Sequence, residues 1–118
     1  MPGIEARNFG SPDETRTPEK TKVEIVKIAG GEIGRYTFQP GWRWSECIKP
    51  IVKTDSCQVE HVGYAVSGTL HVKHDDGTET EVTAGDVYRV APGHDAWTVG
   101  NEPAVFVEFQ GAAHYAEG

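Results

Sequence analysis

Two side chains near the middle of the 118-residue sequence could bind a metal ion or transfer a proton. Cys57 and His61 are four residues apart, so on an extended strand they point to the same face. A thiolate and an imidazole together favour zinc or another borderline metal. An ideal strand would separate the two residues by about 13 Å, so both reach one ion only if the chain bends between them.

The same pair raises the question of acid–base chemistry. His61 is the candidate general acid or base, because an unperturbed imidazole titrates at about pH 6.5. Cys57 becomes a nucleophile only if a cation lowers its pKa, and His61 is the one local residue that could supply it. The plain alternative is a buried cysteine that packs as a small hydrophobe and a strand histidine that makes ordinary hydrogen bonds. The residues alone do not decide between a metal-bound site and a metal-free one.

Aromatic and polar side chains predict a small-molecule pocket near the same segments. Trp42 and Trp44 share a face on an extended chain, and Trp97 follows a turn. A barrel mouth lined by aromatic rings and a few polar groups would suit a planar or carboxylate-bearing ligand. The alternative is that the tryptophans are core or interface residues. The expected ligand-binding residues are Trp42, Trp44, Gln58, Tyr64, Asp95 and Trp97.

Short β-rich runs separated by turn residues dominate the sequence from residue 23 onward. No window shows a convincing apolar period of 3.6 residues, and this pattern indicates an antiparallel sandwich or barrel. Alternation places Ala104, Phe106 and Glu108 on one face of the last strand. The predicted strands are residues 23–28, 33–38, 58–66, 69–74, 78–82, 87–90, 97–99 and 104–109.

The two ends of the chain differ from this β-rich part. Residues 1–22 are rich in charge and proline, which predicts a flexible tail or an arm anchored by Ile4 and Phe9. We therefore expect an N-terminal extension over 1–22, a single β domain over 23–110 and a C-terminal tail over 111–118.

Two stretches resemble the motifs of small single-domain cupins. Residues 40–72, PGWRWSECIKPIVKTDSCQVEHVGYAVSGTLHV, look like a divergent first motif that ends at the turn glycine Gly68. Residues 85–97, GDVYRVAPGHDAW, look like the second motif, and residues 75–86 match the hairpin between them. The resemblance implies an all-β, antiparallel jelly-roll barrel and a homodimer.

The cupin pattern also implies a divalent metal held by three histidines and a glutamate, and this set is absent. Counting back from Gly68 puts Asp55, Cys57 and His61 at the first-motif ligand positions. Counting forward from Gly93 reaches Ala96, with Asp95 and His94 close by. The resemblance therefore suggests a non-standard metal-ligand set of Asp55, Cys57, His61 and one of His94 or Asp95, with His94 preferred. Asp55 or Asp95 would otherwise accept a hydrogen bond from a ligand imidazole.

The composition narrows the classes of partner. The formal net charge is −7, which argues against nucleic acid and anionic membranes as partners. Two cysteines and no apolar leader indicate a reduced, cytoplasmic chain. The leading hypothesis is a protein that binds a small molecule inside the barrel. The alternative is a cupin enzyme of oxygenase, isomerase or lyase type that uses zinc, iron, manganese or nickel.

Overall fold

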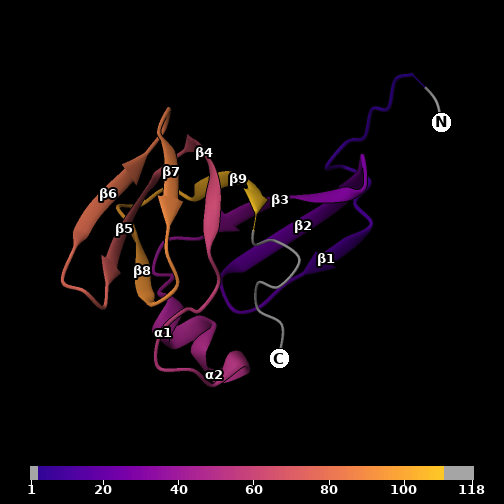
Figure 1. The fold of residues 1–118 in the computed structure, drawn as a ribbon. Helices are drawn as coiled ribbons and strands as arrows, with labels where there is room; N and C mark the ends of the chain where they lie inside the picture. Colours follow the sequence, from indigo (N-terminus) through magenta and orange to yellow (C-terminus); the bar gives the residue numbers. More distant parts are fainter. Residues whose placement is uncertain (1–2, 111–118) are drawn as a thin grey trace.

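The computed structural model describes residues 3–110, with only the backbone of Gln110, and it is almost entirely β-structure (Figure 1). Two short helices interrupt the strands before the middle of the chain. The elements within the described residues are β1 (Glu14–Arg16), β2 (Thr21–Ile28), β3 (Gly31–Phe38), α1 (Trp44–Cys47), α2 (Lys49–Val52), β4 (His61–Ser67), β5 (Thr69–His74), β6 (Glu79–Thr83), β7 (Val87–Val90), β8 (His94–Val99) and β9 (Ala104–Gln110).

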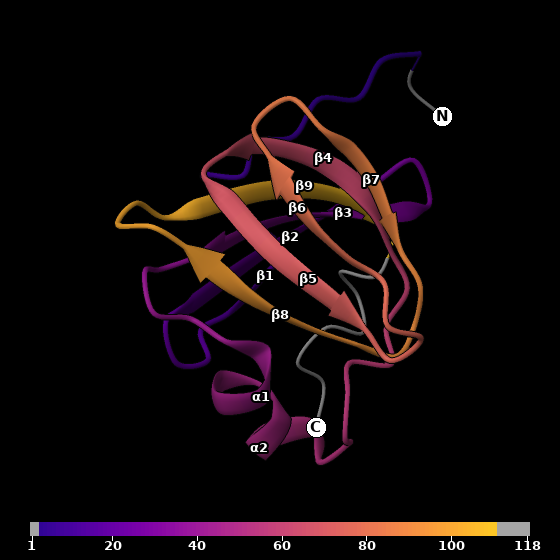
Figure 2. The same cartoon turned by 90° about the vertical axis from the view of Figure 1, so that its left-hand side faces the viewer.

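The strands form two antiparallel sheets that face each other (Figure 2). The larger sheet has the order β1-β2-β3-β9-β4-β7, and the smaller has the order β6-β5-β8. The predicted all-β jelly roll is thereby confirmed. The two sheets do not close into one continuous ring of hydrogen bonds, because β6 and β7 end their sheets without pairing with each other.

Apolar side chains from both sheets fill the space between them. Alternation along β3 buries Tyr36 and Phe38, and alternation along β9 buries Ala104 and Phe106. The smaller sheet contributes Val72, Val82 and Ala96 from the opposite side. The core therefore lies in the slab between the sheets, where burial of apolar surface stabilises the fold.

The two helices were not foreseen from the sequence. Each has four residues, and a segment that short cannot display an apolar period of 3.6 residues. Trp44 and Cys47 of α1 are buried in the core. None of the helices among the described residues is long and apolar enough to cross a membrane.

The N-terminal segment contacts the larger sheet. Strand β1 lies within the predicted extension over 1–22 and pairs with β2. The Arg35 guanidinium lies 5.0 Å from the centre of the Phe9 ring, whereas Ile4 is 88% exposed. The predicted tail over 111–118 lies outside the described residues.

Gly68 makes the sharp turn between β4 and β5 that leads from one sheet to the other. Its φ is +75°, and a Cβ there would lie 2.6 Å from Ala104 Cα and even closer to the Pro103 carbonyl oxygen. Gly77 in the β5–β6 hairpin has a φ of +95° but open space around it. The two glycines thus share a left-handed backbone and differ in crowding.

We predict that Gly68→Ala destabilises the fold much more than Gly77→Ala. Both substitutions should lower the free energy of unfolding by about 1–2 kcal/mol, because each places a side chain on a left-handed backbone. Gly68→Ala should cost about 1–3 kcal/mol more, because the new methyl group meets backbone atoms that cannot move freely. Urea denaturation followed by circular dichroism measures both values, and equal costs would contradict the crowding at Gly68.

Candidate functional site

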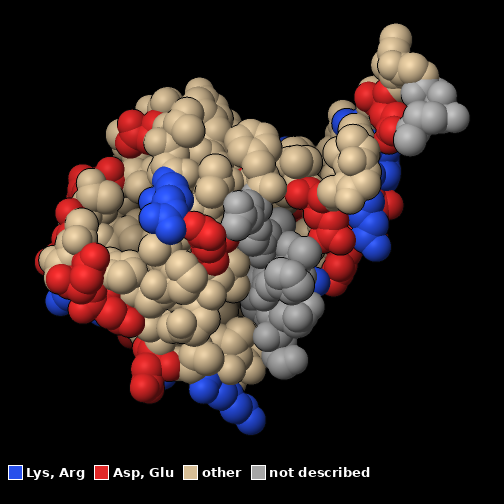
Figure 3. Space-filling view, viewed as in Figure 1, with Lys and Arg blue, Asp and Glu red and all other residues tan. Residues whose placement is uncertain are grey.

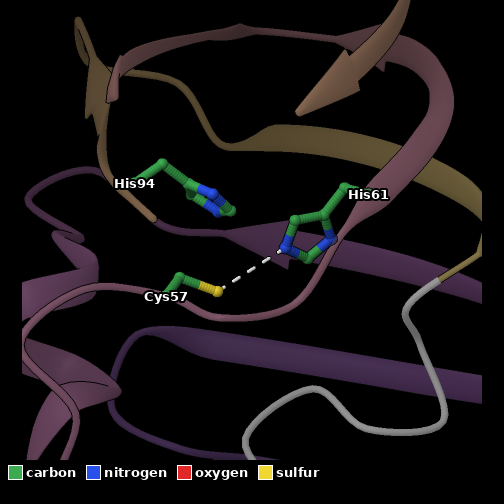
Figure 4. Close-up of side chains that lie close together, drawn as sticks. All are labelled: Cys57, His61 and His94. Atoms are coloured by element: carbon green, nitrogen blue, oxygen red, sulfur yellow. Dashed lines mark hydrogen bonds between the residues drawn. The ribbon is translucent and has the colours of Figure 1, made fainter. Parts of the chain in front are cut away.

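Three buried donor side chains converge between the two sheets. Cys57, His61 and His94 each offer one ligand atom, and these atoms all lie within 4.8 Å of one another. Figure 4 shows Cys57 and His61, from one bent stretch of chain, and His94, from β8, pointing toward a common point. None of the three is more than 6% exposed, so they meet away from bulk solvent.

The backbone between Cys57 and His61 bends to make this possible. The predicted strand over 58–66 begins only at His61, because Cys57 is held elsewhere, in an isolated bridge with His94. The Cys57 amide donates to the His94 carbonyl at 2.7 Å, and the Gly93 amide donates to the Cys57 carbonyl at 2.6 Å. Cys57 Sγ consequently lies 3.7 Å from His61 Nε2, where an extended chain would keep the two residues far apart.

A buried carboxylate fixes the His61 ring from the other side. His61 Nδ1 lies 2.5 Å from Glu108 Oε1, and the Tyr88 hydroxyl donates to Glu108 Oε2 at 2.5 Å. Gly63 leaves room for this network, since a Cβ there would lie 2.8 Å from the Tyr88 hydroxyl. The arrangement directs His61 Nε2 toward Cys57 and leaves Nδ1 on the carboxylate.

Glu108 had no assigned role in the sequence analysis. The only available sign was a glutamate on the strand face that carries Ala104 and Phe106. Alternation alone could not tell which face of β9 is buried. The structure buries that face and leaves Glu108 only 5% exposed.

The pKa values of the site residues show how strongly these groups interact. Burial disfavours the Cys57 thiolate, but hydrogen bonds from His61 and His94 outweigh burial and lower the pKa of Cys57 to about 6. Burial disfavours the His61 imidazolium, but the Glu108 carboxylate and the Cys57 sulfur outweigh it and raise the pKa of His61 to about 10. Burial and the same carboxylate raise the pKa of Tyr88 far above its usual range, so Tyr88 stays a proton donor.

His94 is oriented by its own backbone surroundings. Its Nδ1 lies 2.8 Å from the Ala91 carbonyl oxygen, so Nδ1 carries the proton and donates it. The other ring nitrogen, Nε2, is then left for the donor cluster. The His94 ring lies edge-on to the His61 ring, with their centres 5.2 Å apart.

The donor cluster borders a small cavity between the sheets. The cavity measures about 40 Å³, which is room for roughly three water molecules. Its polar wall consists of His61, His94, Tyr88 and Glu108. The remaining wall is aromatic and aliphatic, contributed by Tyr36, Phe38, Trp42, Leu70, Val72, Val82, Val90, Ala96 and Phe106.

Of the expected ligand-binding residues, Trp42 lines this cavity and the others lie elsewhere. Trp44 is buried in the core beside the cavity residues but is not part of the wall. Trp97 lies on the outer side of β8, where it stacks on His71 with ring centres 4.6 Å apart and lies 4.3 Å from the Arg43 guanidinium. Alternation along β8 explains this, because Ala96 takes the inward position.

The remaining polar candidates also point away from the cavity. Tyr64 is 42% exposed, since it alternates with the buried Gly63 and Ala65 on β4. Gln58 is exposed and bonds to Ser56. Asp95 accepts a hydrogen bond from the Ser45 amide outside the cavity wall.

Asp55 is separated from the donor cluster, although counting from Gly68 placed it at a ligand position. It is exposed, whereas its neighbour Ser56 turns inward and bonds to Asp75. His71 and His74 also lie outside the cluster. His71 contacts Glu79 at 2.9 Å and Glu81 at 3.7 Å, along the rim of β5 and β6, where Figure 3 shows acidic side chains gathered.

The donor set fits a divalent transition metal. Zinc bonds to sulfur and nitrogen measure about 2.0–2.3 Å, so tetrahedral ligand atoms lie about 3.3–3.8 Å apart. The 3.7 Å between Cys57 Sγ and His61 Nε2 falls within this range, and all three atoms lie within 4.8 Å of one another. A tetrahedral ion held by these three side chains would need a fourth ligand from outside this set. The His61–Glu108 pair adds the carboxylate partner that metal-binding histidines commonly have.

Comparisons with known proteins identify the fold. No family model matches the chain, and no curated protein matches it. An RmlC-like cupin from Shewanella frigidimarina is similar at 21% identity and a TM-score of 0.60, covering 94% of this chain and 95% of its own. A structure of unknown function from Rhizobium leguminosarum has 18% identity and a TM-score of 0.63, with 91% and 97% covered.

A larger enzyme contains a similar unit. Oxalate decarboxylase from Lactobacillus farciminis, in a formate complex, matches at 20% identity and a TM-score of 0.60, over 86% of this chain and 32% of that chain. Identities this low establish a shared architecture and leave activity open. The facing sheets and these similarities show that the protein has a cupin-like jelly-roll fold.

Proposed function

We propose that the protein binds a divalent transition metal through Cys57, His61 and His94 and uses it to bind a small molecule in the adjoining cavity. The observation that carries the proposal is the convergence of three buried donor atoms within 4.8 Å. Sulfur and imidazole donors favour zinc, with iron, manganese and nickel as further candidates. The cupin-like fold of the neighbours supports the placement of a ligand between the sheets.

The residues around the donors have separate tasks in this proposal. Cys57 supplies a thiolate that is already deprotonated at neutral pH. Glu108 holds the proton on His61 Nδ1, so that Nε2 is the atom that loses its proton and becomes the ligand. A metal bound here supplies Lewis-acid polarisation of a ligand oxygen in the cavity. The buried walls keep bulk water away from that position.

A second candidate function is binding of a small molecule without a metal. It is favoured by the aromatic and aliphatic wall, which would bury an apolar ligand in the absence of any ion. In that case the Cys57 thiolate and the His61 imidazolium form an ion pair beside the ligand, and His61 is the acid–base group. Metal analysis separates the two candidates.

We predict one equivalent of bound metal in protein purified without a histidine tag and incubated in turn with zinc, iron, manganese and nickel. Replacing Cys57, His61 or His94 by alanine should weaken binding by more than about 100-fold, because even partners outside the ligand shell contribute about 10–100-fold. Elemental analysis and competition with a chelating dye measure both quantities.

Matched variants distinguish the loss of a metal ligand from a general loss of folding. Cys47→Ala removes the other buried thiol, and His71→Ala removes an imidazole outside the cluster, so both should retain full metal content. Less than about a tenth of an equivalent with every metal would contradict the proposed metal function.

Glu108→Gln should weaken metal binding about 10–100-fold while leaving all three ligands in place. The amide removes the negative charge that makes His61 a stronger donor. Glu79→Gln is the matched control, because Glu79 contacts His71 at a similar distance on the surface. Dye competition gives the affinities and urea denaturation checks the fold. An affinity equal to that of the Glu79→Gln protein would show that Glu108 does not support the site.

The pH dependence of metal binding follows from the two shifted pKa values. Between about pH 6 and pH 10 the Cys57–His61 pair shares one proton that the metal must displace. As the pH falls below about 6, the Cys57 thiol gains a second proton that must also leave, so the affinity should fall more steeply. Titrations across this range test the prediction, and the steeper fall should vanish in Cys57→Ala. If the slope of metal affinity against pH in the wild-type protein does not change near pH 6, the prediction is wrong.

A further inference from the structure

A second hollow lies against the small cavity, on the outside of the described part of the molecule. It is an open groove of about 280 Å³ between β6 and β7, the strands that end the two sheets. Val72, Val82, Tyr88 and Val90 line both the groove and the cavity. Because each of these side chains borders both hollows, the wall between them is one side chain thick.

The exposure of the cavity wall indicates the same side of the molecule. Of the described residues that line the cavity, only Leu70, Tyr88 and Val90 are partly exposed, and the rest are buried. Tyr88 and Val90 belong to β7 and also line the groove, whereas Leu70 does not. The cavity therefore comes nearest to solvent at the groove, and Leu70 marks the other place to consider.

The boundary between β6 and β7 is fixed by hydrogen bonds at its two ends. At one end, the Asp86 amide donates to the Thr83 carbonyl at 2.9 Å and closes the turn between the strands. At the other end, His74 Nε2 donates to the Pro92 carbonyl at 2.8 Å. The two strands do not pair with each other between these ends. A small separation there breaks no hydrogen bond of the sheets, so this part of the wall can open at low cost.

The polarity changes along the path from the groove to the cavity. The shared wall is apolar apart from the Tyr88 hydroxyl, which already donates to Glu108. Further out, the groove is lined by polar side chains, namely His74, Asp76, Thr78, Thr80 and Arg89. A ligand that fills both hollows is therefore apolar where it passes the valines and polar at its outer end.

We infer that the groove is the outer part of the ligand site and that an unbranched molecule reaches the cavity past Val82 of β6 and Val90 of β7, leaving a polar end in the groove. The inference rests on the proposed function in that it assigns a small molecule to this cavity, and it requires no metal. The cavity of about 40 Å³ holds about three to five non-hydrogen atoms, so a longer ligand needs the groove for the rest of its length. A branched carbon is wider than a methylene chain, and a closely packed wall excludes it.

The experiment compares two isomers that differ in branching, the straight-chain 1,6-hexanediol and the branched 2,3-dimethyl-2,3-butanediol. Methyl signals in nuclear magnetic resonance spectra locate each probe on the protein. Leu70 and Ala96 line the cavity and not the groove, whereas Thr80 and Ala91 line the groove and not the cavity. We expect 1,6-hexanediol to shift the signals of both pairs. The branched isomer should shift only the signals of Thr80 and Ala91.

Variants of the wall test where the ligand enters. Val90→Ala should let the branched isomer shift the Ala96 signal, because the shorter side chain widens the passage. Leu70→Ala is the matched control, because it shortens another partly exposed aliphatic side chain of the cavity wall that does not line the groove. It should leave the selectivity unchanged. Urea denaturation checks that both variants fold.

A third variant tests the groove itself. Thr80→Tyr places a ring in the groove and should weaken the binding of 1,6-hexanediol about tenfold, which corresponds to losing the burial of about two methylene groups. Glu81→Tyr is the matched control, because Glu81 neighbours Thr80 on β6 and does not line the groove. Titrations followed by the same methyl signals give the affinities.

Four results would overturn the inference: cavity signals that do not respond to 1,6-hexanediol, equal entry of both isomers into the wild-type protein, entry of the branched isomer into Leu70→Ala as readily as into Val90→Ala, or equal affinities of the two tyrosine variants. Metal content measured in the same samples keeps this test separate from the proposed metal site. Entry of 1,6-hexanediol into protein that never takes up metal would support the groove and contradict the metal. Full metal loading without entry would reject the groove and leave the metal site standing.

Discussion

The site depends on a backbone bridge that holds the Cys57 segment against the start of β8. The Cys57 amide and carbonyl are both engaged there, to the His94 carbonyl and the Gly93 amide. This bridge keeps Cys57 out of the strand that begins at His61 and turns the sulfur back toward the imidazole. His61 belongs to the larger sheet and His94 to the smaller, so the donors meet only because the two sheets pack face to face.

Packing of the sheets also explains how charged groups can be buried in the interior without a large energetic cost. Glu108 would be costly to bury alone, but it accepts from Tyr88 and contacts His61. The imidazole in turn contacts the Cys57 sulfur, so each group is the partner of the next. The surrounding aromatic wall lowers the local dielectric and strengthens these contacts, which is why the pKa values of Cys57 and His61 move in opposite directions.

Much of the fold was predictable because β-strands display their faces directly in sequence. The alternation in β5 and β9 and the turn at Gly68 lie where the sequence pattern predicts them. Cys57 and His61 stood out by residue type and spacing, and His94 came from the resemblance to the second cupin motif. The helices could not be predicted because they are too short to show an apolar period. The role of Glu108 could not be predicted because alternation does not reveal which face of a strand is buried.

The sequence by itself determined the strand periodicity, the position of the sharp turns and the supply of sulfur and imidazole donors, since these depend on neighbouring residues. The tertiary structure decided which donors meet. Asp55 and Trp97 had the right chemistry, yet one is exposed and the other lies on the outer side of β8. Trp42, Glu108 and His94 are distant along the chain and share one cavity only through the pairing of strands and the packing of two sheets. Such long-range contacts depend on the whole fold, and local sequence patterns do not encode them.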